Sequence, residues 1–252
     1  MGNIISWISS YADVAPQHKQ QVLDEAYTQI ARWYDGKHKS AGFNAAGLAK
    51  QQLAEYLPSA HMLDLAGGTG DMTVYFQSRQ AALKRTAVST VYDLNAHMLE
   101  IAQRRLENKE WRDRVAIRQG NAEHLPYADG EFGVCCCAFG LHNMPNRRKV
   151  LEEAMRVLKP GGVMAVLEMN TGDSWAWRAA YMGFHWLLVM PLLSLQGSGS
   201  EVQRRLIVSA LNFPAPSRFT QELRDAGFVV DEQRSQSICY RYYRIFIGVK
   251  PQ

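Results

Sequence analysis

The sequence predicts an α/β fold in which a mostly parallel sheet carries helices on both faces. From residue 61 onward, short apolar segments alternate with helical patterns, which is typical of a parallel sheet. A glycine-rich turn follows the first apolar segment and opens a helix. The chain has 252 residues, 47% of them hydrophobic and 21% charged, and this composition excludes wholesale disorder and suits one large domain.

Five strands with intervening helices can be placed before residue 170. Each expected strand is a short apolar run, and the helices between them place apolar side chains at helical spacing. The expected strands cover residues 61–66, 89–94, 115–119, 133–139 and 163–169. The expected helices begin at 73–79 and cover 96–109 and 147–158. Pro160, Gly161 and Gly162 are expected to turn the chain into the fifth strand.

The alternation of strands and helices ends after Asn170. An apolar helical insert is expected over about 174–212. A capped helix is then expected from Ser217 to a stop at Gly227. Two closing strands complete a seven-stranded sheet whose closing strand is antiparallel. Residues 1–57 are expected to form an N-terminal helical cap that could contact a membrane, ahead of one domain over 58–252.

Charge and cysteine usage narrow the possible functions. The net charge of +4 is too small to indicate a nucleic-acid partner, and none is expected. No apolar run reaches the roughly 18 to 20 residues that a spanning helix needs. Cys135, Cys136 and Cys137 are consecutive, and neighbouring strand residues point to opposite faces. They are expected to be buried in a core strand of a reduced, intracellular protein, and no metal site is expected.

The N-terminus carries two features that concern membranes. Gly2 and Ser6 fit the pattern for N-myristoylation, but a match at two positions is weak and chance is the simpler explanation. Ile4, Ile5 and Ile8 share one helical face. That face could lie on a membrane surface or dock on the domain.

The strongest local feature is the segment from residue 62 to 71. Gly67, Gly68 and Gly70 lack side chains, so the backbone can approach a ligand closely. The helix that follows offers free N–H groups at its start. After the second strand, Asp93 stands where a carboxylate accepts hydrogen bonds from both ribose hydroxyls of a nucleoside.

The same loop discriminates between nucleoside cofactors. The dinucleotide fingerprint G-x-G-x-x-G fails because Thr73 stands where the third glycine should be. Asp71 is poorly suited to a pyrophosphate and well suited to a cationic group. S-adenosylmethionine carries an ammonium and a sulfonium but no phosphate, so the loop favours it over NAD. Asn121 and Ala122 are expected to read the adenine edge, with Met98 and Leu125 packed on its faces.

These segments resemble the class I S-adenosylmethionine-dependent methyltransferases, and specifically the UbiE/MenG family of ubiquinone and menaquinone biosynthesis C-methyltransferases. The matching motifs are LDLAGGTGD (63–71), YDLNAHML (92–99), GNAEHLPYADGEF (120–132), FGLHNM (139–144) and RVLKPGGVMAVLE (156–168). The resemblance implies a Rossmann-like methyltransferase fold, S-adenosyl-L-methionine as cofactor and no metal. It also implies methylation of a ring carbon of a polyprenylated benzoquinol or naphthoquinol.

The resemblance implies a cofactor contact at each position of this chain that matches a contact residue of the family. Thr69 and the glycines around it correspond to the methionine side, Asp93 to the ribose, Asn121 and Ala122 to the adenine, and Ala138 to a further contact. The full set of expected cofactor residues is Asp64, Ala66, Gly67, Gly68, Thr69, Gly70, Asp71, Asp93, Leu94, Met98, Asn121, Ala122 and Ala138.

The chain departs from the family at His142, where arginine is usual, and in its N-terminal and final segments. His142 follows the fourth strand and is expected to face the cofactor cleft. An imidazole titrates near neutral pH, so His142 could take the proton from a quinol hydroxyl while Asn143 orients the oxygen. A capping or supporting role for His142 is the alternative.

The apolar segment 181–195 fits an acceptor with a prenyl tail, although a packed cap over the sheet explains it equally well. The expected location is intracellular and peripheral to a membrane: the cytoplasmic face, or the mitochondrial inner membrane of a eukaryote. A homo-oligomer or a quinone-biosynthesis complex fits that location. Two other functions stay open: an enzyme with another lipophilic acceptor or a different quinone-ring modification, and a non-catalytic scaffold.

Overall fold

The computed structural model describes residues 45–189, 191, 213–239 and 241–252. The expected helices before residue 45, the myristoylation pattern and most of the insert after residue 189 lie outside the described residues. Within the described part of the chain, no helix is both long enough and apolar enough to span a membrane.

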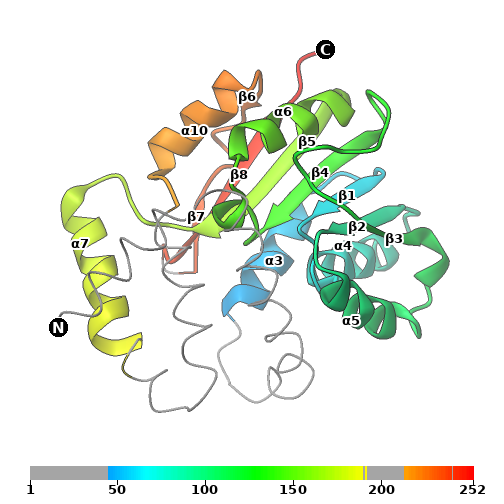
Figure 1. Cartoon of the computed structure of the whole chain (residues 1–252), viewed down its shortest axis with the longest axis horizontal. Helices are drawn as coiled ribbons and strands as arrows, with labels where there is room; N and C mark the ends of the chain where they lie inside the picture. The colour runs from blue at the N-terminus through cyan, green and yellow to red at the C-terminus, as the bar shows by residue number, and fades with distance from the viewer. Residues whose placement is uncertain (1–44, 190, 192–212, 240) are drawn as a thin grey trace.

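One sheet of eight strands forms the centre of the described structure (Figure 1). Its order is β3-β2-β1-β4-β5-β8-β6, with β7 also paired to β8. The parallel strands are β1 Met62–Leu65, β2 Ser89–Asp93, β3 Val115–Gln119, β4 Phe132–Ala138 and β5 Leu158–Met169. Strand β8, Tyr243–Val249, is antiparallel to β5, and it also pairs with β6, Val229–Val230, and β7, Ser237–Ile238.

The expected fold class is therefore confirmed, with one more strand than the seven predicted. The additional strand is β7, which has only two residues and leaves no recognisable alternation in the sequence. The segment around Pro160 differs as well. Strand β5 already begins at Leu158, and residues 159–162 bulge out of the ladder before Val163 pairs with Val134. Gly161 has a φ of +73° in this bulge, which a residue with a side chain adopts only with strain.

Helices cover both faces of the sheet. Two helices, α6 Arg147–Val157 and α10 Pro216–Asp225, pack on one face (Figure 1). The opposite face carries α3 Ala45–Tyr56, α4 Asp71–Ala82 and α5 Ala96–Leu106. The three cysteines follow the strand alternation: Cys135 and Cys137 belong to the core under α6, and Cys136 belongs to the core under α3 and α4. Their prediction as buried residues of a core strand is confirmed.

Asparagines cap two of the helices that follow strands. The Asn95 side chain accepts a hydrogen bond from the Met98 N–H at the start of α5, and Asn146 does the same for Lys149 at the start of α6. The predicted cap at Ser217 is wrong. Helix α10 begins at Pro216, and the Ser217 N–H donates to the carboxylate of Asp173, 44 positions earlier in the chain.

The described part of the insert lies beside the end of the sheet. Helix α7, Trp175–Phe184, continues into a π-helix, η3, over His185–Val189. Tyr181 and His185 are buried on the inner side of this segment, where His185 Nδ1 donates to the Tyr181 carbonyl and Nε2 is hydrogen-bonded to the Tyr242 hydroxyl. Burial lowers the pKa of His185, so its imidazole is neutral and belongs to the core. Trp175, Phe184, Leu187 and Leu188 of the segment are exposed, whereas Trp177 and Trp186 are half-buried.

Candidate active site

A cavity of about 320 Å³ opens at the carboxyl ends of β1, β2 and β4. Ligands of open α/β sheets bind at this edge, where the strand order reverses. Twelve of the expected site residues line the cavity: Ala66, Gly67, Gly68, Thr69, Asp71, Asp93, Leu94, Met98, Asn121, Ala122, Ala138 and Asn143. Asp64, Gly70 and His142, which were also expected at the site, are not among the residues that line it.

The glycine-rich loop is held in a tight turn above β1. The Gly70 N–H donates to the Gly67 carbonyl at 2.8 Å, and Gly68 and Gly70 have φ values of +52° and +76°. A Cβ at Gly67 would lie 2.8 Å from the Val91 side chain and 2.9 Å from the Asp64 carbonyl oxygen. Only glycine fits at that position, because real Cβ atoms essentially never approach other atoms so closely.

Asp93 joins this loop to the end of β2. One of its carboxylate oxygens accepts the Gly68 N–H at 2.8 Å, and the other accepts the Asn95 N–H at 2.8 Å. Carboxylate oxygens can each accept more than one hydrogen bond. Because Asp93 also lines the cavity, the geometry is compatible with two further hydrogen bonds from a pair of neighbouring hydroxyls.

Asp71 is paired with two cations of the chain itself. Lys50 of α3 lies 3.0 Å from one carboxylate oxygen, and Arg105 of α5 lies 2.5 Å from the other. Burial alone would raise the pKa of Asp71, but Lys50 and Arg105 outweigh it and lower the pKa to about 2. Arg105 also donates to the Thr69 hydroxyl at 2.7 Å and carbonyl at 3.1 Å. This end of the cavity therefore combines a carboxylate with two cations.

Asp71 was predicted from the sequence as a partner for a cationic group, but Lys50 and Arg105 were not predicted. Lys50 lines the cavity from a helix 21 positions before Asp71, and Arg105 approaches from 34 positions after it. No local pattern indicates either contact. The basic last turn of α5, which contains Arg104 and Arg105, was the only available hint.

The loop after β3 forms the opposite wall of the cavity. Asn121 turns back to accept the Glu123 N–H at 2.9 Å, and a Cβ on Gly120 would overlap the Tyr92 hydroxyl. Met98 lies in the cavity wall as expected. Leu125 does not, because its side chain is 5% exposed within the core and its N–H donates to the Glu153 carboxylate at 2.8 Å.

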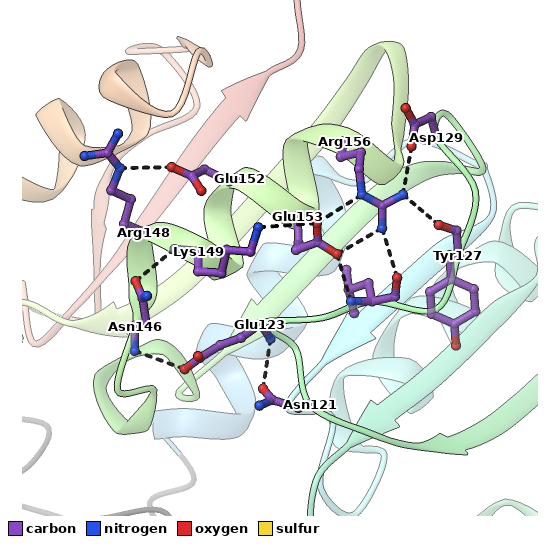
Figure 2. Close-up of polar contacts among 11 residues, drawn as sticks. Asn121, Glu123, Tyr127, Asp129, Asn146, Arg148, Lys149, Glu152, Glu153 and Arg156 are labelled. Carbon is purple, nitrogen blue, oxygen red and sulfur yellow. Dashed lines mark hydrogen bonds and ion pairs between the residues drawn. The ribbon is translucent and has the colours of Figure 1, made fainter. Parts of the chain in front are cut away.

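A hydrogen-bond network on α6 holds this loop in place (Figure 2). Arg156 donates to the Tyr127 and Leu125 carbonyls and to the carboxylates of Glu153 and Asp129. At the other end of the view, the Asn146 N–H donates to Glu123 at 3.1 Å. The loop is thereby fastened both to α6 and to the segment that follows β4.

Asp64 lies beneath the loop and not in the cavity. Its carboxylate accepts the Thr73 hydroxyl at 2.7 Å and the Thr73 N–H at 3.1 Å. Complete burial raises its pKa to about 7. Gly70 is also covered, since a Cβ there would face Leu106 and Ala102 of α5. Both residues shape the loop from below.

His142 is buried between β5 and the cavity wall. It lies in the short helix η2, Leu141–Asn143, and its Nδ1 is 2.8 Å from the Glu168 carboxylate. Its Nε2 is 2.9 Å from the Asn143 amide nitrogen, and Asn143 lines the cavity. The expectation that His142 itself faces the cleft is thus corrected: Glu168 draws the imidazole inward, and Asn143 stands between it and the cavity.

The fold and this site define the class: the chain has the Rossmann-like fold of class I methyltransferases, with the glycine loop and the acid after β2 at the expected edge. The chain belongs to the ubiE/COQ5 methyltransferase family, which its residues 16–244 match. The resemblance drawn from the sequence motifs and the expected enzyme class, a methyltransferase, are confirmed.

Individual relatives agree with this family. A ubiquinone/menaquinone biosynthesis C-methyltransferase UbiE from Methylobacterium nodulans is 34% identical over 238 residues, covering 91% of this chain and 92% of that protein. A mitochondrial 2-methoxy-6-polyprenyl-1,4-benzoquinol methylase from Drosophila melanogaster is 29% identical, covering 95% and 83% of the two chains. A solved SAM-dependent methyltransferase from Thermotoga maritima has the same fold, with a TM-score of 0.59, 18% identity, and coverage of 90% and 99%.

Proposed function

We propose that this protein uses S-adenosyl-L-methionine to methylate a ring carbon of a polyprenylated benzoquinol or naphthoquinol. The observation that carries the proposal is the cavity at the strand ends, in which Asp93 is held against the glycine loop by the Gly68 N–H. One relative is named a ubiquinone/menaquinone biosynthesis C-methyltransferase and another a 2-methoxy-6-polyprenyl-1,4-benzoquinol methylase, and this chain covers most of the length of both.

The residues present fit S-adenosylmethionine. Its amino-acid end carries one positive and one negative group, which match the Asp71 carboxylate and the Lys50 ammonium at one end of the cavity. Asp93 would accept the ribose hydroxyls, while Met98 and Leu94 offer apolar contact to the adenine beside Asn121. When bound, this cofactor supplies an electrophilic methyl group.

The protein has to position the acceptor and remove its proton. A quinol ring carbon becomes strongly nucleophilic when the neighbouring hydroxyl is deprotonated. His142 acts as the base in this proposal, and Asn143, which lines the cavity, orients the oxygen. Alignment of the ring carbon with the methyl group supplies the remaining rate acceleration. Holding two reactants in the right geometry can remove much of the barrier to a displacement of this kind.

The exposed apolar side chains of α7 and η3 support contact with a membrane. Trp175 is 83% exposed, Leu187 78%, Leu188 54% and Phe184 47%. Such a surface can enter the interfacial region of a bilayer, where a prenylated acceptor resides. Peripheral attachment, either at the cytoplasmic face or at the mitochondrial inner membrane, is part of the proposal. Assembly into an oligomer or a quinone-biosynthesis complex stays a prediction.

Two measurements test the proposal. Isothermal titration calorimetry should show binding of S-adenosylmethionine, and cells that lack the protein should accumulate a quinone without one ring methyl group. Absence of cofactor binding would favour a scaffold role. Loss of a differently modified quinone, with the methylated quinones unchanged, would favour another ring modification, an alternative suggested by His142 in place of the family's usual arginine.

A further inference from the structure

We infer that Glu168 is a positioning residue that fixes the tautomer and orientation of the His142 imidazole. This inference rests on the proposed role of His142 as the base. Glu168 is fully buried on β5, and the His142 side chain is 6% exposed. One Glu168 oxygen lies 2.8 Å from His142 Nδ1, and the other accepts the His142 backbone N–H at 3.3 Å.

The fold brings these two residues together through a rigid connection. Strands β4 and β5 are parallel neighbours, and beyond the end of β4 the Phe139 N–H still donates to the Leu167 carbonyl at 2.8 Å. The chain then turns at Gly140, where a Cβ would lie 2.6 Å from the Ala66 Cβ and 2.8 Å from the Cys137 Sγ. Helix η2 starts directly after this turn, which sets His142 above Glu168.

In this proposal, the proton of the neutral His142 imidazole is assigned from its two hydrogen-bond partners. With the Glu168 carboxylate as acceptor, His142 Nδ1 is the donor in this contact. In the neutral imidazole, Nε2 then holds the lone pair and accepts from the Asn143 amide at 2.9 Å. Glu168 therefore directs the basic nitrogen toward Asn143 and the cavity behind it.

This arrangement specifies the proton step. In this step the Asn143 amide turns from Nε2 to the incoming quinol oxygen, the quinol O–H bond breaks, an Nε2–H bond forms, and the electron pair stays on the quinol oxygen. The Glu168 carboxylate then faces an imidazolium, whose positive charge it stabilises. A carboxylate that orients an imidazole in this way is a common element of nucleophilic and acid–base sites.

The test uses the full-length protein with nitrogen-15-labelled histidine. Imidazole nitrogen shifts distinguish the two neutral tautomers, and the wild-type spectrum should show His142 with its proton on Nδ1. Glu168→Gln should shift His142 toward a mixture of tautomers and lower kcat roughly 100-fold. The dissociation constant for S-adenosylmethionine should stay unchanged, because Glu168 does not line the cavity.

Controls separate this role from general damage to the fold. Glu222→Gln, which removes a half-buried carboxylate paired with Arg147, should leave the tautomer and kcat unchanged. Glu168→Asp retains the charge and should recover part of the lost kcat. A wild-type His142 protonated on Nε2, or a Glu168→Gln variant that binds cofactor and keeps kcat within twofold, would overturn the inference.

The same experiment keeps the two proposals apart. The tautomer of His142 is read from the spectrum without any substrate. The methyltransferase proposal is tested by turnover of a demethylated quinol with a short prenyl tail. A wild-type protein with the expected tautomer but no turnover on quinols contradicts the proposed substrate and leaves the role of Glu168 in orienting His142 intact.

Discussion

The carboxylate of Asp93 accepts a hydrogen bond from the Gly68 N–H at 2.8 Å and thereby ties the end of β2 to the glycine loop above β1. The two residues are 25 positions apart in the sequence: Asp93 ends β2, and Gly68 lies in the loop that follows the neighbouring strand β1. This contact places an acidic group at the wall of the cavity before any ligand enters. It also makes the shape of the loop depend on the residue that is proposed to bind the ribose.

We expect Asp93→Asn to weaken S-adenosylmethionine binding by about 10- to 100-fold, because a hydrogen bond to a charged group contributes about 1.5 to 3 kcal/mol. Isothermal titration calorimetry measures the change. Asp113→Asn, at an exposed position in the short helix Arg112–Arg114, is the matched control and should bind normally. Equal affinities for the two variants would remove Asp93 from the binding site.

The pairing of Asp71 with Lys50 and Arg105 leads to a prediction about stability in acid. The pKa of Asp71 is lowered from its ordinary 3.8 to about 2, so the unfolded chain takes up the proton first as the pH falls. The stabilisation is complete above pH 4 and is lost as the pH falls toward 2. Asp71→Asn should cost about 2 kcal/mol of unfolding free energy at pH 7, and denaturant titrations should show a smaller cost at pH 3. A difference that does not depend on pH would contradict this assignment.

The contribution of Asp64 to stability depends on pH in the opposite direction, because its pKa is raised from 3.8 to about 7. Its buried carboxyl favours the protonated form, so its contribution to stability is complete below pH 4 and is lost as the pH rises through 7. Asp64→Asn stays neutral at every pH. Relative to wild type, this variant should therefore gain on the order of 2 kcal/mol of unfolding free energy between pH 5 and pH 8.

Comparing the variants at two pH values cancels any effect that does not depend on pH, such as altered hydrogen bonding to Thr73. Ser59→Ala, at an exposed hydroxyl outside the site, is a neutral control for the titrations. If the difference between Asp64→Asn and wild type is the same at pH 5 and pH 8, the carboxyl does not change its protonation state in this range.

Most of the fold was predictable because it rests on local signals. Apolar runs, apolar side chains at helical spacing and the glycine loop each indicate an element within a few residues, and their order leaves few topologies. The contacts that complete the site come from distant segments. Lys50 gives no sign in its own helix that it pairs with Asp71. The sequence around Leu125 likewise does not show that Glu153 of α6 binds the Leu125 N–H and keeps this residue out of the cavity wall.

The partner of His142 could be predicted from the sequence only in part. Strand β5 is buried and apolar from Val163 to Leu167, and Glu168 follows as a fully buried acid. A buried carboxylate requires a hydrogen-bonding partner. The acid that follows this apolar run therefore was a usable sign of a paired group near the carboxyl end of the strand. The identity of the partner depends on the turn at Gly140, which the sequence pattern does not reveal.

The exposed side chains of α7 and η3 give the last prediction, that Trp175→Ser and Leu187→Ser each weaken binding to anionic phospholipid vesicles. Full burial of a large apolar side chain contributes about 1.5 to 3 kcal/mol, so each substitution should reduce partitioning by about tenfold. Sedimentation with vesicles measures this directly. Val229→Ser, at a 61% exposed position on β6, is the matched control and should partition as wild type does. Because neither Trp175 nor Leu187 lines the cavity, both variants should keep their affinity for S-adenosylmethionine. Unchanged partitioning of both would show that this face does not contact the bilayer.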